Sequence, residues 1–413
     1  MKKMHPIAGE KMIKKIVALS LLIALFVITR SVFNSYAGSY DSGNWLEVQL
    51  NEAQKESFDD TLKKANNGDP IAQYHLGIMY YMGFGVTMDN KEAARWYTKA
   101  AEQGLSIAEY TLGVSYSNGD GVPRDNEKAL DLYTKAAEQG DVNAQFSLAA
   151  TYDRGFMGVH QDKKKALDWY TKAAEQGDVN AQYCLAVMYD DGDGIRKNKG
   201  KALEWYTKAA EQGDADSQYN LGEMYDSGDG VPQDKKKAVE WYTKASEQGN
   251  THAQLLLGKL YQDGEVVQKD IKKALGLYTK AAEQGYANAQ FWLGWSYKHG
   301  KDVPNDKKKA VEWLTKAAEQ DFAAAQYELS MSYYKGDGVP QDNKKALELC
   351  KKAAEQGLPS AQSYLGLIYI LGEGVKVNKF EAYNWLIKAA KQGDEEAQNS
   401  LDILCKESPW VCK

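Results

Sequence analysis

The stretch Tyr97-Thr98-Lys99-Ala100-Ala101-Glu102-Gln103-Gly104 recurs, barely altered, along most of this chain of 413 residues. Its later copies end on Gly140, Gly177, Gly213, Gly249, Gly285, Asp321, Gly357 and Gly393, and Gly68 closes a degenerate first copy. The interval between copies is 36 residues, with a single interval of 37. A fixed period of about 20 to 50 residues indicates a unit that buries its apolar face only by stacking on its neighbours.

Each unit carries the pattern of two helices separated by glycine turns. In the first unit Ala72, Leu76, Met79 and Tyr80 fall at i, i+4, i+7 and i+8, which places them on one face of a helix. Glycines such as those at 83–86 end this helix, because glycine tolerates a positive φ. The second helix begins at an Asp or Asn suited to cap it, namely Asp89, Asp125, Asp162, Asn198, Asp234, Asp270, Asp306, Asp342 and Asn378. The sequence therefore predicts an all-α solenoid.

The predicted solenoid has nine full units within residues 69–393. The units are 69–104, 105–140, 141–177, 178–213, 214–249, 250–285, 286–321, 322–357 and 358–393. Residues 38–68 are expected to form a linker and an N-terminal capping helix, and residues 394–413 a C-terminal capping helix and tail. Terminal caps of this kind cover the ends of repeat arrays.

The first thirty residues differ from the rest in composition. Lysines precede an apolar run of 13 residues, 16–28, which has the length of a signal-peptide core. The run is shorter than the roughly 20 residues that cross a bilayer as a helix. We therefore expect residues 1–37 to be a signal peptide cleaved after Ala37, or an uncleaved anchor, with either Met1 or Met12 as the start. The expected location is the periplasm or the medium, or the inner membrane facing the periplasm if the segment is uncleaved.

The four cysteines suit an oxidising compartment. Cys405 and Cys412 lie seven residues apart in a proline-containing tail, and we expect them to form a disulfide that ties the terminus to the last helix. Cys184 and Cys350 fall at helical positions in different units. They are interpreted as small buried or half-buried residues, whether or not their thiols are free.

Composition and spacing argue against nucleic acid, metal and cofactor as ligands. The formal net charge of −6 comes from 51 Lys+Arg against 57 Asp+Glu, too acidic and too evenly mixed for a nucleic-acid footprint. The five histidines show no i, i+4 pairing and no cysteine companions, so no zinc site is predicted. The turn at 191–194 is similar to part of a calcium loop, but Tyr189 stands where the first carboxylate ligand is required.

The full pattern of a unit resembles a known family. It reads Ala-Gln-Tyr-x-Leu-Gly, then Tyr, Gly-x-Gly-Val, Asp, Lys-Ala and Trp-Tyr-x-Lys-Ala-Ala-Glu-Gln-Gly, and at its 36-residue period it resembles the Sel1-like repeat, a relative of the tetratricopeptide repeat. The resemblance covers residues 69–405. It implies a right-handed α/α superhelix whose first helices line the concave side. It also implies an exported or envelope-associated adaptor that binds envelope or host proteins, although function must still come from the site.

An enzyme is the alternative from a different class. A cysteine-rich branch of the family has been credited with penicillin binding or β-lactam hydrolysis, and residues 332–335 spell S-x-x-K, with Ser332 in the place of the nucleophile. The motifs S-D-N and K-T-G are absent from the sequence, and so are the cysteine pairs of that branch. We therefore expect no catalysis. A β-lactam-binding envelope enzyme, or a regulator of a cell-wall enzyme, remains the alternative.

Lysine runs open several second helices, among them 163–165, 235–237 and 307–309. Stacked at one period, they would form a basic stripe that could dock an acidic partner. The other interpretation is a solvated face offset by loop aspartates, and it is favoured because charge runs on repeat surfaces usually serve solubility.

The units differ most on one face of the first helix. Positions 71, 75, 78 and 82 share this face, and in the fifth unit it is polar, with Asn220 and Glu223. In later units the same positions hold Leu256, Trp292, Trp295, Met331, Tyr364, Leu367 and Leu371, here named the apolar band. Because adjacent first helices stand about 10 Å apart, we expect one exposed apolar surface that binds a protein partner. The alternative is that the tail, with Pro409, Trp410 and Val411, folds back over part of the band.

Overall fold

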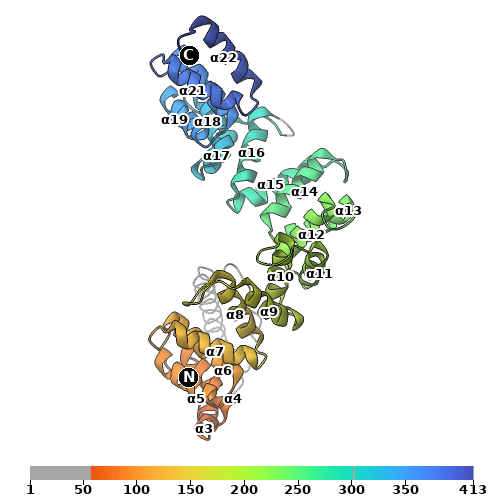
Figure 1. Cartoon of the computed structure of the whole chain (residues 1–413), viewed down its shortest axis with the longest axis vertical. Helices are drawn as coiled ribbons and strands as arrows, with labels where there is room; N and C mark the ends of the chain where they lie inside the picture. Colours follow the sequence, from red (N-terminus) through yellow and green to blue (C-terminus); the bar gives the residue numbers. More distant parts are fainter. Residues whose placement is uncertain (1–56, 301–302, 413) are drawn as a thin grey trace, which may run out of the picture. The chain divides into compact units, whose positions relative to one another are not determined.

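The computed structural model describes residues 57–300 and 303–412, which form twenty α-helices and no strand (Figure 1). The first helices of the nine units are α4 (Pro70–Met82), α6 (Ser106–Asn118), α8 (Val142–Arg154), α10 (Val179–Asp191), α12 (Ala215–Ser227), α14 (Thr251–Asp263), α16 (Ala287–His299), α18 (Ala323–Lys335) and α20 (Pro359–Leu371). The second helices are α5 (Asn90–Glu102), α7 (Asn126–Glu138), α9 (Lys163–Glu175), α11 (Lys199–Glu211), α13 (Lys235–Glu247), α15 (Ile271–Glu283), α17 (Lys307–Glu319), α19 (Asn343–Glu355) and α21 (Lys379–Ala390). Before and after the array lie α3 (Phe58–Asn66) and α22 (Glu395–Glu407).

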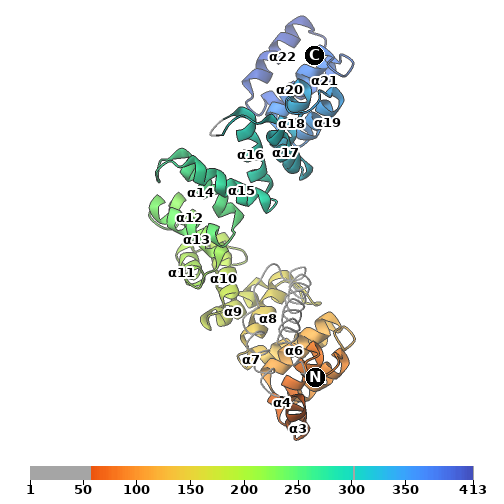
Figure 2. The same ribbon diagram turned by 180° about the vertical axis from the view of Figure 1, so that it is seen from behind.

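At a larger scale than the repeat units, the helices fall into two compact parts, Met1–Gln212 and Gly213–Lys413. Within each, every helix packs against the next, so that α12 and α13, for example, lie side by side in both views (Figures 1 and 2). The predicted all-α solenoid with a two-helix repeat of about 36 residues is confirmed. The expected signal peptide or anchor, 1–37, lies outside the described residues. Within the described ranges, every helix is too short or too polar to cross a bilayer.

Local capping starts each helix where the sequence predicts it. All nine Asp and Asn residues proposed as second-helix caps accept hydrogen bonds from backbone N–H groups of the first turn. Asp141 does the same at the start of α8, where its Oδ1 accepts from the N–H of Ala144 at 2.8 Å. A cap satisfies donors that have no partner inside the helix, so its effect needs no tertiary contact and is readable from sequence.

A ladder of glutamines joins neighbouring helices. Gln320, which follows α17, donates from Nε2 to Oε1 of Gln290 on α16 at 2.8 Å, and Gln290 donates from Nε2 to the carbonyl of Ala282 on α15 at 3.0 Å. The first of these two bonds recurs as Gln103 with Gln73, Gln176 with Gln145, Gln212 with Gln182, Gln248 with Gln218, Gln284 with Gln254, Gln356 with Gln326 and Gln392 with Gln362. The glutamine of the recurring phrase is therefore a joint between helices.

In the second unit an acid replaces one glutamine of this ladder. Glu109 stands in the glutamine position, 6 % exposed, and its Oε2 accepts from Nε2 of Gln139 at 2.6 Å. Burial raises the pKa of Glu109, because the charged form is poorly solvated there. Unlike a glutamine, the ionised carboxylate has no N–H to donate to the preceding helix.

Replacing Glu109 with Gln is expected to raise the free energy of unfolding by about 1 kcal/mol at neutral pH, since it restores one buried hydrogen bond and removes a buried charge. A folded-state pKa above the unfolded value destabilises the fold as pH rises through the interval between the two, from about 4.3 upward. The gain should therefore shrink as pH falls to about 4. Urea unfolding of both proteins at each pH measures it, with the exposed Glu102→Gln as control. A gain that is independent of pH would contradict this account.

Candidate protein-binding surface

The seven residues of the apolar band all lie on first helices of the second compact part, Gly213–Lys413. They are distributed over α14, α16, α18 and α20, one or more on each helix. Trp292 is 37 % exposed and Leu371 is 64 % exposed. The other five, Leu256, Trp295, Met331, Tyr364 and Leu367, are half-buried. None of the seven is fully buried, so the band is an apolar surface of graded exposure.

Aromatic contacts hold the centre of the band in place. The rings of Trp292 and Trp295 meet edge to face with centroids 5.8 Å apart, and Trp295 contacts the ring of His299 at 4.7 Å. On the next units, Tyr364 of α20 contacts Tyr334 of α18 at 6.1 Å. Edge-to-face pairs of this kind restrict the rotamers of the rings they join. Binding on a preordered aromatic surface loses less side-chain entropy.

An ion pair crosses the band between two units. Lys298 of α16 donates from Nζ to Oε2 of Glu328 on α18 at 2.6 Å and to the backbone carbonyl of Glu328 at 2.8 Å. Both side chains are mostly buried. Because each charge satisfies the other, the pair presents little net charge to a partner, and it fixes the spacing of α16 and α18.

One further residue extends the band. Ile403 of α22 is 59 % exposed and follows Trp295, Met331 and Leu367 at successive intervals of 36 residues. The 36-residue interval is the sequence signal that could have identified Ile403 as part of this surface. The sequence interpretation missed Ile403 because residues 394–413 were assigned only a capping role.

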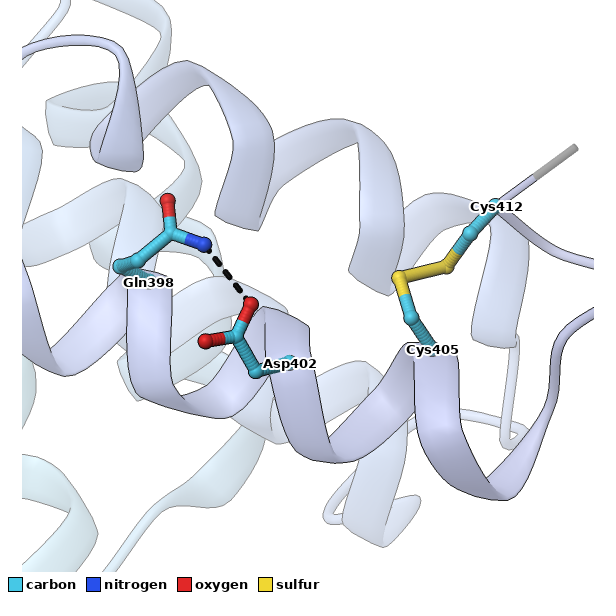
Figure 3. The surroundings of a disulfide bond; sticks show 4 residues. All are labelled: Gln398, Asp402, Cys405 and Cys412. Carbon is cyan, nitrogen blue, oxygen red and sulfur yellow. Dashed lines mark hydrogen bonds between the residues drawn. A yellow bond between two sulfur atoms is a disulfide. The ribbon is translucent and has the colours of Figure 1, made fainter.

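The C-terminal tail packs on a second helix. Cys405 and Cys412 form a disulfide with a Cα–Cα distance of 5.6 Å (Figure 3). The ring of Trp410 contacts that of Phe380 on α21 at 5.1 Å, and Nζ of Lys379 donates to Oγ of Ser408 at 2.7 Å. These contacts lie on α21, and Trp292 and Leu371 remain exposed on the first helices.

The residues considered for chemistry have structural contacts. Ser332 of the S-x-x-K sequence is buried in α18 and donates from Oγ to the carbonyl of Glu328 at 3.1 Å. Cys350 is buried, and burial raises the pKa of its thiol to about 12, which keeps it protonated at neutral pH. Cys184 is half-buried. In the part of the chain that is described, no group of three or more His, Cys, Asp or Glu side chains could hold a metal ion.

The lysine runs contact their own chain. Lys163 forms ion pairs with Asp153, at 2.8 Å, and with Asp193 of the next unit, and Lys307 pairs with Asp337 of the next unit at 2.5 Å. The third lysine of each run lies over the tyrosine ring at the end of the preceding first helix, as Lys165 over Tyr152, Lys237 over Tyr225 and Lys309 over Tyr297. These contacts favour the interpretation that the runs do not form a docking stripe.

Paired helices stacked at a 36-residue period, with the variable residues on the first helices, define a helical-repeat scaffold of the tetratricopeptide-like class, which is typical of protein–protein interaction. The Sel1 repeat model matches nine consecutive segments, 70–105, 106–141, 142–178, 179–214, 215–250, 251–286, 287–322, 323–358 and 359–394. The chain belongs to the Sel1 repeat family. The predicted family is confirmed.

Two solved structures are similar over most of the chain. The first is c5321, described as a protective antigen present in uropathogenic Escherichia coli strains, with 38 % identity, a TM-score of 0.78, and coverage of 85 % of this chain and 75 % of that one. The second is a Sel1 repeat protein from Oxalobacter formigenes, with 35 % identity, a TM-score of 0.60, and coverage of 75 % and 90 %. A comparison with curated proteins found no match.

Proposed function

We propose that this protein is an exported scaffold that binds an envelope or host protein on the concave face of its repeats, through the apolar band, and that it performs no catalysis. The observation that carries the proposal is the exposure of Trp292 and its contact with Trp295, at positions that are polar in the fifth unit. Tryptophan and tyrosine are the residues most enriched at the centres of protein interfaces. Exposed apolar patches on soluble proteins mark such interfaces.

Export is supported by the apolar run at 16–28 and by the similar protein described as a protective antigen. The proposed location is the periplasm or the medium, with an inner-membrane anchor if residues 1–37 stay attached. The absence of catalysis is supported by Ser332, whose hydroxyl is buried and bonded to the backbone of its own helix.

Replacing Trp292 and Trp295 together with Ser is expected to weaken partner binding by about 100-fold or more, because interface hot spots each contribute at least about 2 kcal/mol. The purified full chain and the variant are used to capture proteins from envelope extract and from host-cell lysate. Mass spectrometry identifies the partner, and titration of that partner measures the affinity.

The matched control is Phe156→Ser, which removes an exposed aromatic side chain that lies in a turn outside the band. This variant should bind the partner as the parent chain does. Helical circular dichroism and melting should be unchanged in all three proteins. Loss of folding in the double variant would show that the two tryptophans belong to the core, and unchanged capture by it would place the partner elsewhere.

A further inference from the structure

The first-helix face of residues 213–413 changes from acidic on α12 to apolar on α16, α18 and α20. The column at the position of Glu223 continues as Lys259, Trp295, Met331, Leu367 and Ile403, and that of Asp226 continues as Gln262, Lys298, Tyr334 and Ile370. Helix α12 carries three acids, Asp216, Glu223 and Asp226, and no lysine or arginine. Helix α20 carries no charged residue at all.

The acids of α12 are available to a cation. Asp216 and Glu223 are exposed and Asp226 is half-buried. Asp216 accepts a hydrogen bond from the neutral side chain of Asn250 at 2.8 Å, and Glu223 has a hydrogen bond with Tyr219. No described lysine or arginine forms an ion pair with any of the three.

Other units neutralise the equivalent position. Asp153 and Asp190 stand where Asp226 stands in the fifth unit, and they pair with Lys163 at 2.8 Å and Lys199 at 2.5 Å. The fifth unit also has a lysine, Lys235, at the corresponding point of its second helix, but this lysine and Asp226 form no ion pair. Asp226 therefore keeps a charge that the third and fourth units cancel internally at the equivalent position.

We propose that the first-helix face of residues 213–413 binds a single segment of a partner protein that has lysine or arginine at one end and apolar or aromatic side chains at the other. The basic end lies on α12 and the apolar end on α16 to α20. This inference rests on the proposed function and adds the chemistry and the direction of the bound segment.

Charge and distance fit such a segment. A cationic end lowers its energy beside Glu223 and Asp226. On α14 the exposed Lys259 offsets the exposed Asp263, and from α16 to α20 the only acid on the first helices is Glu328, which is paired with Lys298. Lys298 and Glu328 neutralise each other, so this ion pair places little net charge beside the apolar end of the bound segment. From α12 to α16 is two repeat steps, about 20 Å, which an extended chain crosses in about six residues.

The test uses the full chain and three fluorescent synthetic peptides, with affinity read from anisotropy. The first peptide has a lysine cluster, a neutral spacer of about six residues and a Leu/Phe stretch. The second has glutamates in place of the lysines. The third has the composition of the first, with the lysines dispersed among the apolar residues. The first is expected to bind at least about tenfold tighter than either of the others at low salt, because only it places charge on α12 and apolar side chains on the band.

Reversing the charge of α12 tests whether the basic end of the peptide binds at this helix, and not through general attraction to an acidic protein. In Glu223→Lys/Asp226→Lys the first peptide should lose at least about tenfold in affinity and the second should gain. The control is Glu240→Lys/Glu247→Lys, which makes the same charge change on exposed positions of α13 in the same unit and should leave both affinities unchanged. The neutral variant Glu223→Gln/Asp226→Asn should give an intermediate loss, and circular dichroism confirms that each variant folds.

Several results would overturn the inference. Equal binding of the three peptides, or equal binding of a lysine cluster without its apolar stretch, would show attraction without a directed site. If the chain self-associates and the first peptide does not displace the second copy, the face is assigned to self-association. If Trp292→Ser/Trp295→Ser loses the captured partner while the charge reversal on α12 alters no affinity, the inference fails and the proposed function stands. If the tryptophan variant binds as the parent does, both fail.

Discussion

Replacing Tyr242 with Ala is expected to lower the free energy of unfolding by about 3–5 kcal/mol, the range for removal of a buried aromatic ring. Tyr242 of α13 is 1 % exposed and packs against Ala253 and Leu257 of the following helix. Its ring occupies the space that a side chain at Gly222 would need, so the glycine and the tyrosine are shaped for each other. The change therefore opens a cavity at the joint between the fifth and sixth units.

Urea unfolding followed by circular dichroism measures the loss, and the chain itself supplies the matched control. The seventh and ninth units carry Leu314 and Leu386 at the equivalent position, packed against Gly294 and Gly366. Tyr242→Leu should therefore retain most of the stability. Because each repeat contacts only its neighbours, the Ala variant should also unfold in a broader transition as the two sides uncouple. Equal losses for Ala and Leu would contradict the role given to the ring.

The repeat, the helix order and the caps could all be predicted from the sequence, because each depends on local chemistry repeated in phase. An Asp such as Asp234 caps its helix through backbone groups two and three residues away, whatever else surrounds it. The glutamine ladder was not predicted. Gln320 and Gln290 are 30 residues apart, and nothing local states that their amides meet.

The candidate surface was predicted in position but not in detail. The helical period places Trp295 and Tyr364 on the first-helix face, yet each is half-buried. A ring of the same unit, His299, lies against Trp295, and a ring of the preceding unit, Tyr334, lies against Tyr364. The ion pair of Lys298 with Glu328 also depends on how far one side chain reaches across two units. Export and the identity of residues 1–37 remain predictions.

Replacing Gly338 with Ala is expected to lower the free energy of unfolding by about 2–4 kcal/mol, from left-handed backbone strain and overpacking together. Gly338 has φ +78°, and a Cβ at this position would meet the carbonyl oxygen of Lys307 well inside contact distance. The same turn supplies Asp337, which pairs with Lys307 at 2.5 Å. The turn of the eighth unit is therefore seated on the start of α17, and backbone must move to admit a methyl group.

Gly357→Ala separates the strain from the clash. Gly357 has φ +92° with open space around its Cα, so alanine there meets only the backbone strain, and Asp321 already adopts φ +58° at the equivalent position of the seventh unit. Its loss should be near 1 kcal/mol, the lower end of the range for a left-handed residue. The sixth unit has Val266 where the eighth has Gly338, and Val266 is not among the residues with positive φ. If the two alanine variants lose equal stability, the turn of the eighth unit can adopt a backbone without positive φ, as the sixth unit does at Val266. The contact of this turn with the start of α17 would then not require a glycine.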